Sequence, residues 1–235
     1  MNQPRFTMAA ATAVFLYGAR RYFRNWGTTK EECRMHLPGD ELIRPPVIQT
    51  TEGISIDASV AAVWPWLVQM GQDRGGLYGY EFLENSIGLH HRNASRIHPE
   101  WQRIAPGDVI RLSPQGWLGL HDGVAFTVAE VIEGRAPGEQ ATEERATEER
   151  AIVLHVAPPS LPWETVWSFH LIPRGDDRCR LLIRSRVGLR RPGEVVLAEI
   201  ASPVTALMTR GMLRGIQRRA RDAPVRTPVA SASPP

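Results

Sequence analysis

The sequence predicts an α+β fold in which a curved antiparallel sheet wraps around a long C-terminal helix. Three observations lead to this fold class. Consecutive strand-like segments with short connections fill much of the region from residue 107 to residue 189, as in an antiparallel meander. A broken pair of short helices precedes them, and a long amphipathic helix follows them. Because that helix has to bury its apolar stripe, we expect it to lie on the concave face of the sheet.

Composition and charge limit the classes of protein that fit. The chain has 235 residues, of which 43% are hydrophobic and 23% charged, as is typical of one globular domain with terminal tails. Its formal net charge of +3 is only mildly basic, and its late arginines also fit the solvated side of a helix, so we expect no nucleic-acid partner. Cys33 and Cys179 lie far apart without metal-type spacing, which favours a reduced, cytoplasmic location.

We expect three parts along the chain: an apolar and basic helix over residues 1–24, a folded domain over residues 25–221, and a disordered tail over residues 222–235. The apolar run over residues 6–19 reaches only about 20 Å, short of the roughly 30 Å hydrocarbon core of a bilayer. The arginines that follow it would keep the domain on the cytoplasmic side of a membrane. Residues 6–24 therefore fit either a contact with the inner face of the cell membrane or a helix that docks on the domain.

The domain begins with a lead-in and a first strand. Residues 25–46 are polar and punctuated by prolines, which predicts an extended segment with one short helix over residues 29–34. The alternation in "EGISIDAS" (residues 52–59) predicts the first strand. Asp57 and Ser59 are both suitable N-caps for the helix that follows.

The segment "VWPWLVQMGQDRGGLYGYEFLENSIG" (residues 63–88) combines aromatic residues with glycines. It predicts a helix that ends at Gly71, a sharp turn at "DRGG" and a second short helix over residues 80–87. Pro65 is expected to be tolerated early in the first helix, where amides have no intrahelical partner. The segment is therefore either a dense core element with a turn or the articulated wall of a cavity.

Further strands are predicted over residues 107–112, 123–132, 151–157, 164–173 and 179–189. The last of these is the clearest. Apolar and small residues alternate from Cys179 to Val187 on one face, while Arg180, Arg184 and Arg186 fall on the other. The strand therefore has one face suited to an apolar core.

A tandem repeat lengthens the connection between the second and third of these strands. The pentapeptide ATEER occurs at residues 141–145 and again at residues 146–150. Surface loops absorb such insertions at little thermodynamic cost, so we expect a longer hairpin loop and assign it no function.

The last helix is predicted to start with Ser202 as its N-cap and Pro203 at its first helical position. Each glycine inside a helix costs about 1 kcal/mol relative to alanine, so either a close contact with the sheet or empty volume for a ligand should offset that cost. The residues on its buried face are predicted from helical spacing to be Val204, Leu207, Met208, Gly211, Gly215 and Ile216.

Several stretches resemble the START-like, or SRPBCC, superfamily, which includes the polyketide cyclase and dehydrase group, and more closely a bacterial branch of it. They are "NWGTTKEE…LPGDEL", "AVWPWLVQMGQDRGGLYGYEFLEN", "PGDVIRL", "RLLIRSR" and "MLRGIQRRA". The resemblance covers roughly residues 25–221. It implies a helix-grip fold whose C-terminal helix closes a deep apolar cavity. It also implies a ligand such as a lipid, sterol, hormone, quinone or polyketide, with catalysis in only some members.

The resemblance places the two short helices at the mouth of the cavity and the last helix over it. These short helices are rich in aromatic residues, which either line the cavity or simply pack in the core. Core packing is also the alternative for Trp64 and Leu67. Arg74, Glu81 and Glu84 could hold a polar group of the ligand or form ordinary salt bridges. The ligand-binding residues expected on this basis are Trp66, Met70, Tyr78, Tyr80, Phe82, Phe126, Trp167, Phe169, Leu207, Met208 and Gly211.

The histidines do not assemble into a recognisable catalytic or metal motif. His90 and His91 should point apart, and no cysteine or carboxylate completes a ligand spacing with His98, so we predict no metal and no cofactor. An inward-facing His155 or His170 could act as an acid or base, but we assign no catalytic residue. The predicted function is binding of a small hydrophobic or amphipathic molecule, lipid- or polyketide-like, in an internal cavity. The alternatives are a cyclase- or dehydrase-type enzyme and a membrane-tethered lipid-handling protein.

Overall fold

The computed structural model describes residues 24–134, 149–189 and 191–222. A six-stranded antiparallel sheet has the order β1-β6-β5-β4-β3-β2, so each of the last five strands pairs with its neighbour in sequence and β1 closes against β6. The predicted strands are confirmed, with shifted ends, as β1 (Ile48–Ile56), β2 (Val109–Arg111), β3 (Ala125–Glu133), β4 (Arg150–Val156), β5 (Glu164–Pro173) and β6 (Cys179–Gly188).

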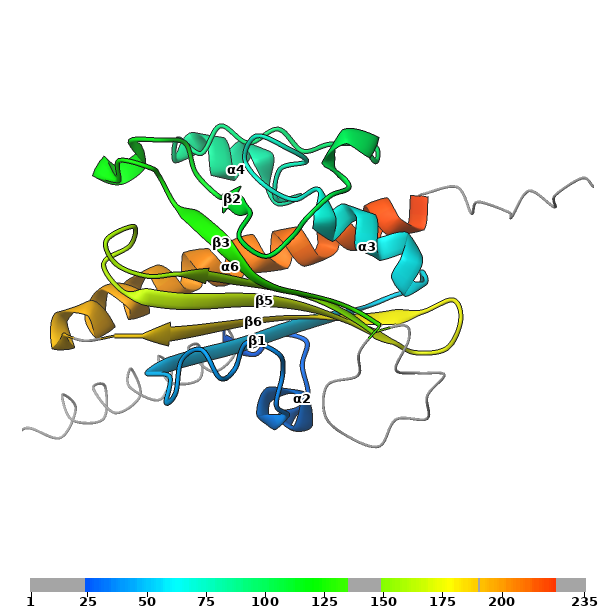
Figure 1. Cartoon of the computed structure of the whole chain (residues 1–235), viewed down its shortest axis with the longest axis horizontal. Helices are drawn as coiled ribbons and strands as arrows, with labels where there is room; N and C mark the ends of the chain where they lie inside the picture. Colours follow the sequence, from blue (N-terminus) through cyan, green and yellow to red (C-terminus); the bar gives the residue numbers. More distant parts are fainter. Residues whose placement is uncertain (1–23, 135–148, 190, 223–235) are drawn as a thin grey trace, which may run out of the picture.

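The long helix α6 (Pro192–Asp222) runs along one face of this curved sheet, which we call the inner face (Figure 1). The helix α2 (Lys30–Arg34) lies on the opposite, outer face, and α4 (Glu81–Ser86) lies on the same side of the sheet as α6 (Figure 1). A sheet that wraps around a long C-terminal helix is the helix-grip arrangement. The predicted fold class is therefore confirmed.

Local capping explains where the short helices begin. Thr29 and Glu32 form a reciprocal capping box at the start of α2. The Ser59 hydroxyl accepts a hydrogen bond from the Ala62 amide (3.3 Å) and caps α3 (Val60–Val68), so Ser59 rather than Asp57 is the N-cap. The expected place of Pro65 in the first turn was wrong, because it lies further inside this helix.

The predicted start of the last helix at Ser202 was also wrong. The helix begins at Pro192, and Pro203 lies inside it. A serine followed by proline is typical of a helix start, but residues 194–201 are themselves mostly good helix formers and extend the helix backwards. The Thr205 hydroxyl donates to the Ser202 carbonyl (3.0 Å) in the turn around this proline.

Between the inner face and α6, aromatic and aliphatic side chains form the main core. The Tyr78 hydroxyl donates to the Trp66 carbonyl (2.9 Å), and the two rings meet edge to face with centroids 5.7 Å apart. A Cβ on Gly215 would lie 1.8 Å from the Tyr78 carbonyl oxygen, and one on Gly211 would lie 2.7 Å from the Tyr80 ring. Close contact therefore explains both helix glycines, and the contact is with the Tyr78–Tyr80 segment.

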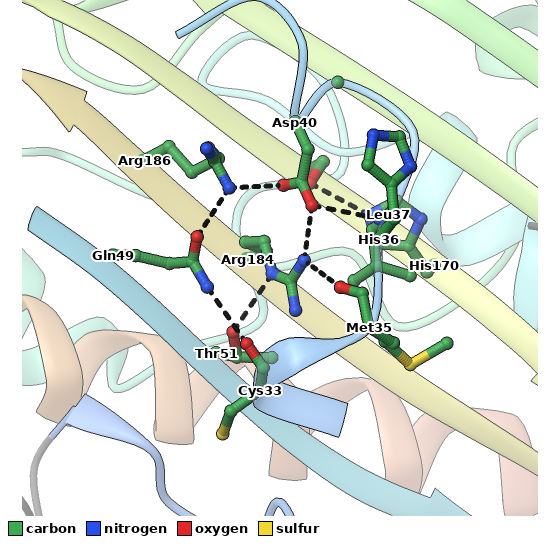
Figure 2. A network of polar contacts seen from close by, with 12 residues as sticks. Cys33, Met35, His36, Leu37, Asp40, Gln49, Thr51, His170, Arg184 and Arg186 are labelled. Atoms are coloured by element: carbon green, nitrogen blue, oxygen red, sulfur yellow. Dashed lines mark hydrogen bonds and ion pairs between the residues drawn. The ribbon is translucent and has the colours of Figure 1, made fainter. Parts of the chain in front are cut away.

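The outer face is covered by the N-terminal lead-in and carries a buried polar network (Figure 2). Arg184, only 1% exposed, lies at its centre. Its guanidinium bonds to Asp40 Oδ2 (2.7 Å) and donates to the carbonyls of Met35 (2.8 Å) and Glu32 (2.7 Å). Its Nε donates to Thr51 Oγ1 (3.1 Å). Each guanidinium nitrogen thus has a partner, which is the condition for burying a charge.

Two further arginines of β6 complete this network. Arg186 Nη1 lies 3.1 Å from Asp40 Oδ1, so one carboxylate bridges two arginines. Arg180 holds both carboxylate oxygens of Glu32 at 2.8 and 2.9 Å in a bidentate pair. The arginine side of the last strand, identified in the sequence by alternation alone, is therefore a second buried layer.

Candidate functional site

An apolar groove lies between α4 and α6. Its volume is about 500 Å³, and Phe82 at its edge is 90% exposed. The turn before α4 positions this helix, because the Gly71 and Gly76 amides each donate to the other residue's carbonyl (3.0 and 2.9 Å) and both residues have positive φ. Exposed aromatic and aliphatic side chains in one place are typical of a binding surface. The groove is lined by Tyr80, Glu81, Phe82, Leu83 and Leu207.

Tyr80 separates this groove from the interior of the domain. Its ring rests against Gly211 of α6, where a Cβ would overlap it, and its hydroxyl lies 3.5 Å from Arg214 Nη1. The ring remains partly exposed on the groove side. Tyr80 is therefore the boundary between the open groove and the packed core.

A polar depression, which we call the basin, lies beside the groove. It is about 380 Å³ in volume and open to solvent. Arg74 is anchored in it by hydrogen bonds to the carbonyls of Trp101 and Arg103, and the His98 ring stacks on Trp101 with centroids 4.2 Å apart. Burial lowers the pKa of Arg74, although Asp108 opposes that shift. The basin is lined by Gln72, Asp73, Arg74, His90, Arg92, Asn93, Ala94, His98 and Trp101.

The groove and the basin share a wall made by two side chains. Asn93, which lines the basin, accepts a hydrogen bond from the Tyr78 amide through Oδ1 (2.6 Å). Its own amide and Nδ2 donate to Glu81 Oε2 (3.4 and 3.5 Å), and Glu81 lines the groove. One contact thus joins the linings of the two depressions.

The predicted ligand-binding residues lie in three settings, which are the open groove, a half-buried position on the inner face and the buried core. Tyr80, Phe82 and Leu207 come together in the groove, with Met208 half-buried next to Leu207 in α6. Trp167 is half-buried on the inner face. The remaining predicted residues are buried between the sheet, α3 and α6, namely Trp66, Met70, Tyr78, Phe126, Phe169 and Gly211.

The histidines lie in different environments. His90 is exposed in the basin, whereas His91 is buried 3.2 Å from Glu84 Oε2 and 2.9 Å from the Leu112 carbonyl, so the prediction that the pair point apart is confirmed. His155 and His170 belong to the outer face, away from α6. Within the described ranges, no cluster of three or more His, Cys, Asp or Glu side chains could hold a metal ion.

Burial strongly shifts the pKa of several titratable groups, and two of them, Glu52 and His170, lie on opposite faces of the sheet. Burial raises the pKa of Glu52, on the inner face, to about 8, and Arg210 opposes part of that shift. Burial lowers the pKa of His170, on the outer face, to about 3, and the nearby Arg184 adds to the effect. Neither side chain lines the groove or the basin.

The basin was missed in the sequence, although Arg74 was considered as a polar contact. Its lining comes from two segments, residues 72–74 and residues 90–101, that carry no shared motif. The available signal was the density of polar and basic residues around His90 and His98, which was weighed only as a metal site. The two segments meet because the Ala94 amide donates to the Gly75 carbonyl (3.0 Å) and the Arg74 guanidinium donates to the Trp101 carbonyl.

Some expectations concern parts of the chain that lie outside the described residues. These parts are residues 1–23, residues 135–148 and residues 223–235. The second of them contains the first ATEER copy and all of the second copy except Glu149 and Arg150. In the segments that are described, none of the helices combines the length and the apolar character needed to cross a bilayer. The predicted membrane contact therefore stays a prediction.

Comparison with known proteins gives similarity of structure at low sequence identity. No protein-family model matches the sequence, and no curated protein matches it significantly. A protein from Thermobifida fusca has a TM-score of 0.41 at 14% identity, over 74% of this chain and 93% of that chain. A protein from Mesorhizobium loti has a TM-score of 0.37 at 14% identity, over 74% and 97% of the two chains.

A truncated norcoclaurine synthase from Thalictrum flavum is also similar, with a TM-score of 0.34 at 13% identity, over 75% of this chain and 94% of that chain. At these values the likeness carries no argument about function. The fold assignment rests on the strand order and on the position of α6. By that topology, the chain has a helix-grip fold.

Proposed function

We propose that the protein binds a small hydrophobic or amphipathic molecule, of lipid- or polyketide-like character, in the groove between α4 and α6. One observation carries this proposal: an open groove of about 500 Å³ is lined mainly by aromatic and aliphatic side chains, with Phe82 almost fully exposed. Covering such side chains removes apolar surface from water, which contributes about 1.5–3 kcal/mol for each large side chain that becomes buried.

The lining supports binding more than catalysis. Among the described residues that line the groove, Glu81 is the one carboxylate, and it already accepts two hydrogen bonds from Asn93. General acid–base catalysis needs a positioned group that is free to exchange a proton with the substrate. Tyr80 offers a hydroxyl, but its ring is held between Gly211 and the groove. Turnover therefore has no specific support in this lining.

Binding can be tested on the full-length chain with Nile red, a neutral hydrophobic dye. We expect saturable fluorescence enhancement that Leu207→Gln weakens severalfold, because this change removes apolar lining without adding charge. Leu42→Gln is the matched control, since Leu42 and Leu207 are 42% and 41% exposed and only Leu207 lines the groove. The absence of saturable binding, or an equal loss in both variants, would contradict the proposal.

A further inference from the structure

We infer that the ligand is an amphiphile with an anionic head group, and that the basin holds this head while the groove holds its apolar part. This inference rests on the proposed function for the apolar part. The two depressions are adjacent, because Asn93 of the basin and Glu81 of the groove are in direct contact. A single molecule whose charged head group is next to its apolar part can therefore occupy both the basin and the groove.

The charges that line the basin favour an anion. Two arginines, Arg74 and Arg92, and one carboxylate, Asp73, face it, so its net charge is positive with the histidines neutral. Arg92 is exposed, and no other side chain or carbonyl in the described part of the chain bonds to it. The neighbouring Arg219, by contrast, donates to the Ala94 carbonyl (2.7 Å). Arg92 is thus the guanidinium available to a carboxylate or phosphate.

The basin also offers a hydrogen-bond acceptor. Gln72 lines it, and the buried Oε1 of Gln72 has no donor among the described residues. A buried amide oxygen without a donor costs free energy unless a ligand supplies one. A head group that carries both a negative charge and a hydroxyl, such as a phosphate monoester, would pair with Arg92 directly, and it would reach Gln72 Oε1 only after this side chain rotates, because that oxygen is buried.

The backbone of the basin is fixed in place. The Ala94 amide donates to the Gly75 carbonyl (3.0 Å), and the His98 amide donates to Gln69 Oε1 (3.0 Å). His90 is held at a φ of 52°, a conformation that residues other than glycine seldom adopt and that is concentrated at functional sites. A preformed site loses less entropy when it binds a small ligand.

Competition against Nile red with amphiphiles of equal chain length tests the head-group preference. The probes are dodecyl phosphate, dodecanoate, dodecanol and dodecyltrimethylammonium, each below its micelle concentration. We expect the two anions to displace the dye at concentrations about threefold to fivefold lower than dodecanol, as one exposed ion pair allows. The cation should be the weakest competitor. Inorganic phosphate should not displace the dye, because it has no apolar part.

Point variants test which residues cause the preference for anionic head groups. Arg92→Gln should remove the advantage of the anions and leave dodecanol unchanged, whereas Asp73→Asn should increase that advantage. Arg178→Gln is the control, because Arg178 is exposed in the turn between β5 and β6 and its replacement changes the net charge equally.

If dodecanol competes as well as the anions in the parent protein, the head-group inference is wrong and the proposed function stands. If none of the amphiphiles displaces the dye, the proposed function fails first. An equal loss in Arg92→Gln and Arg178→Gln, or displacement by inorganic phosphate alone, would also overturn the inference.

Discussion

The two faces of the same sheet are buried by different means. The inner face packs side chains such as Phe169 and Leu181 against α6, and its burial is mostly apolar. The outer face buries Arg184 and Asp40 under the N-terminal lead-in, and its burial depends on paired charges. Apolar burial is graded, because each methylene group contributes a little. A buried charge depends on its partner, so the loss of one group leaves the other uncompensated.

The largest expected effect on the free energy of unfolding comes from a variant of the outer face. Asp40→Ala should lower the free energy of unfolding by about 3–5 kcal/mol, because Arg184 and Arg186 then share a buried site without their common carboxylate. Urea unfolding measures the change. Asp57→Ala is the control, since Asp57 pairs with Arg221 and both side chains are exposed, and it should cost less than about 1 kcal/mol. Similar losses in the two variants would show that burial of the charges does not matter.

The next effect concerns the inner face. Gly215→Ala should lower the free energy of unfolding by about 1–3 kcal/mol, despite the better helix propensity of alanine, because its Cβ would overlap the Tyr78 carbonyl oxygen. Gly193→Ala in the same helix has nothing within 4 Å of the added Cβ and should be neutral or stabilising. Thermal or urea unfolding distinguishes the two. A stabilised Gly215→Ala protein would mean that α6 does not approach Tyr78 closely.

A further effect depends on pH and is spread over several pH units, because one buried group on each face titrates and the two change stability in opposite directions. Glu52 is protonated in the folded state up to about pH 8, whereas its ordinary pKa is 4.5. The unfolded chain therefore binds fewer protons between these values, and stability falls as the pH rises through that window, by up to about 1.4 kcal/mol per pH unit. Glu52→Gln should remove this fall, as urea unfolding at several pH values would show. An unchanged slope would place the Glu52 carboxyl in contact with water.

His170 gives a complementary prediction, because its titration changes stability with pH in the opposite direction. The pKa of this imidazole is about 3 in the folded state and 6.5 ordinarily, so the unfolded chain binds more protons in that window. Stability is then lost as the pH falls below about 6.5, and His170→Gln should reduce that loss without affecting the alkaline side. The two windows overlap between pH 4.5 and 6.5, so the comparison is made above pH 6.5, where of the two groups only Glu52 titrates, and below pH 4.5, where only His170 does. A His170→Gln protein whose stability changed only above pH 6.5 would contradict the low pKa of this imidazole.

The sequence predicts the parts of this fold that depend on local patterns. Strand alternation, the Ser59 cap and the break at Gly71 are each encoded within a few residues. The burial of Arg184 could not be predicted, because alternation shows that a residue lies on the other face but not what covers that face. Pro203 misled the prediction because a proline after a serine is typical of a helix start, whereas α6 continues through this residue.

The same reasoning applies to the candidate site. Tyr80 and Phe82 were expected near Leu207 because the superfamily resemblance places the short helices beside the last helix, and the structure brings them into one groove. Their role in binding stays a prediction. The fit of Tyr78 against Gly215 and the basin around Arg92 depend on tertiary contacts between distant segments, which no local period reports.

The pairing of β1 with β6 also determines when the domain can form during synthesis. Ile56, at the end of β1, pairs with Cys179, and Ile48 pairs with Val187, so the first strand has no partner in the described sheet until nearly all the others exist. At roughly 5–20 residues per second, a ribosome takes on the order of ten seconds to cover that separation. During this interval the lead-in, with Glu32 and Asp40, has no arginines of β6 to bind. Closure of the sheet and assembly of its polar layer are therefore late steps, and a nascent chain that stops before β6 exposes both faces to chaperones and proteases.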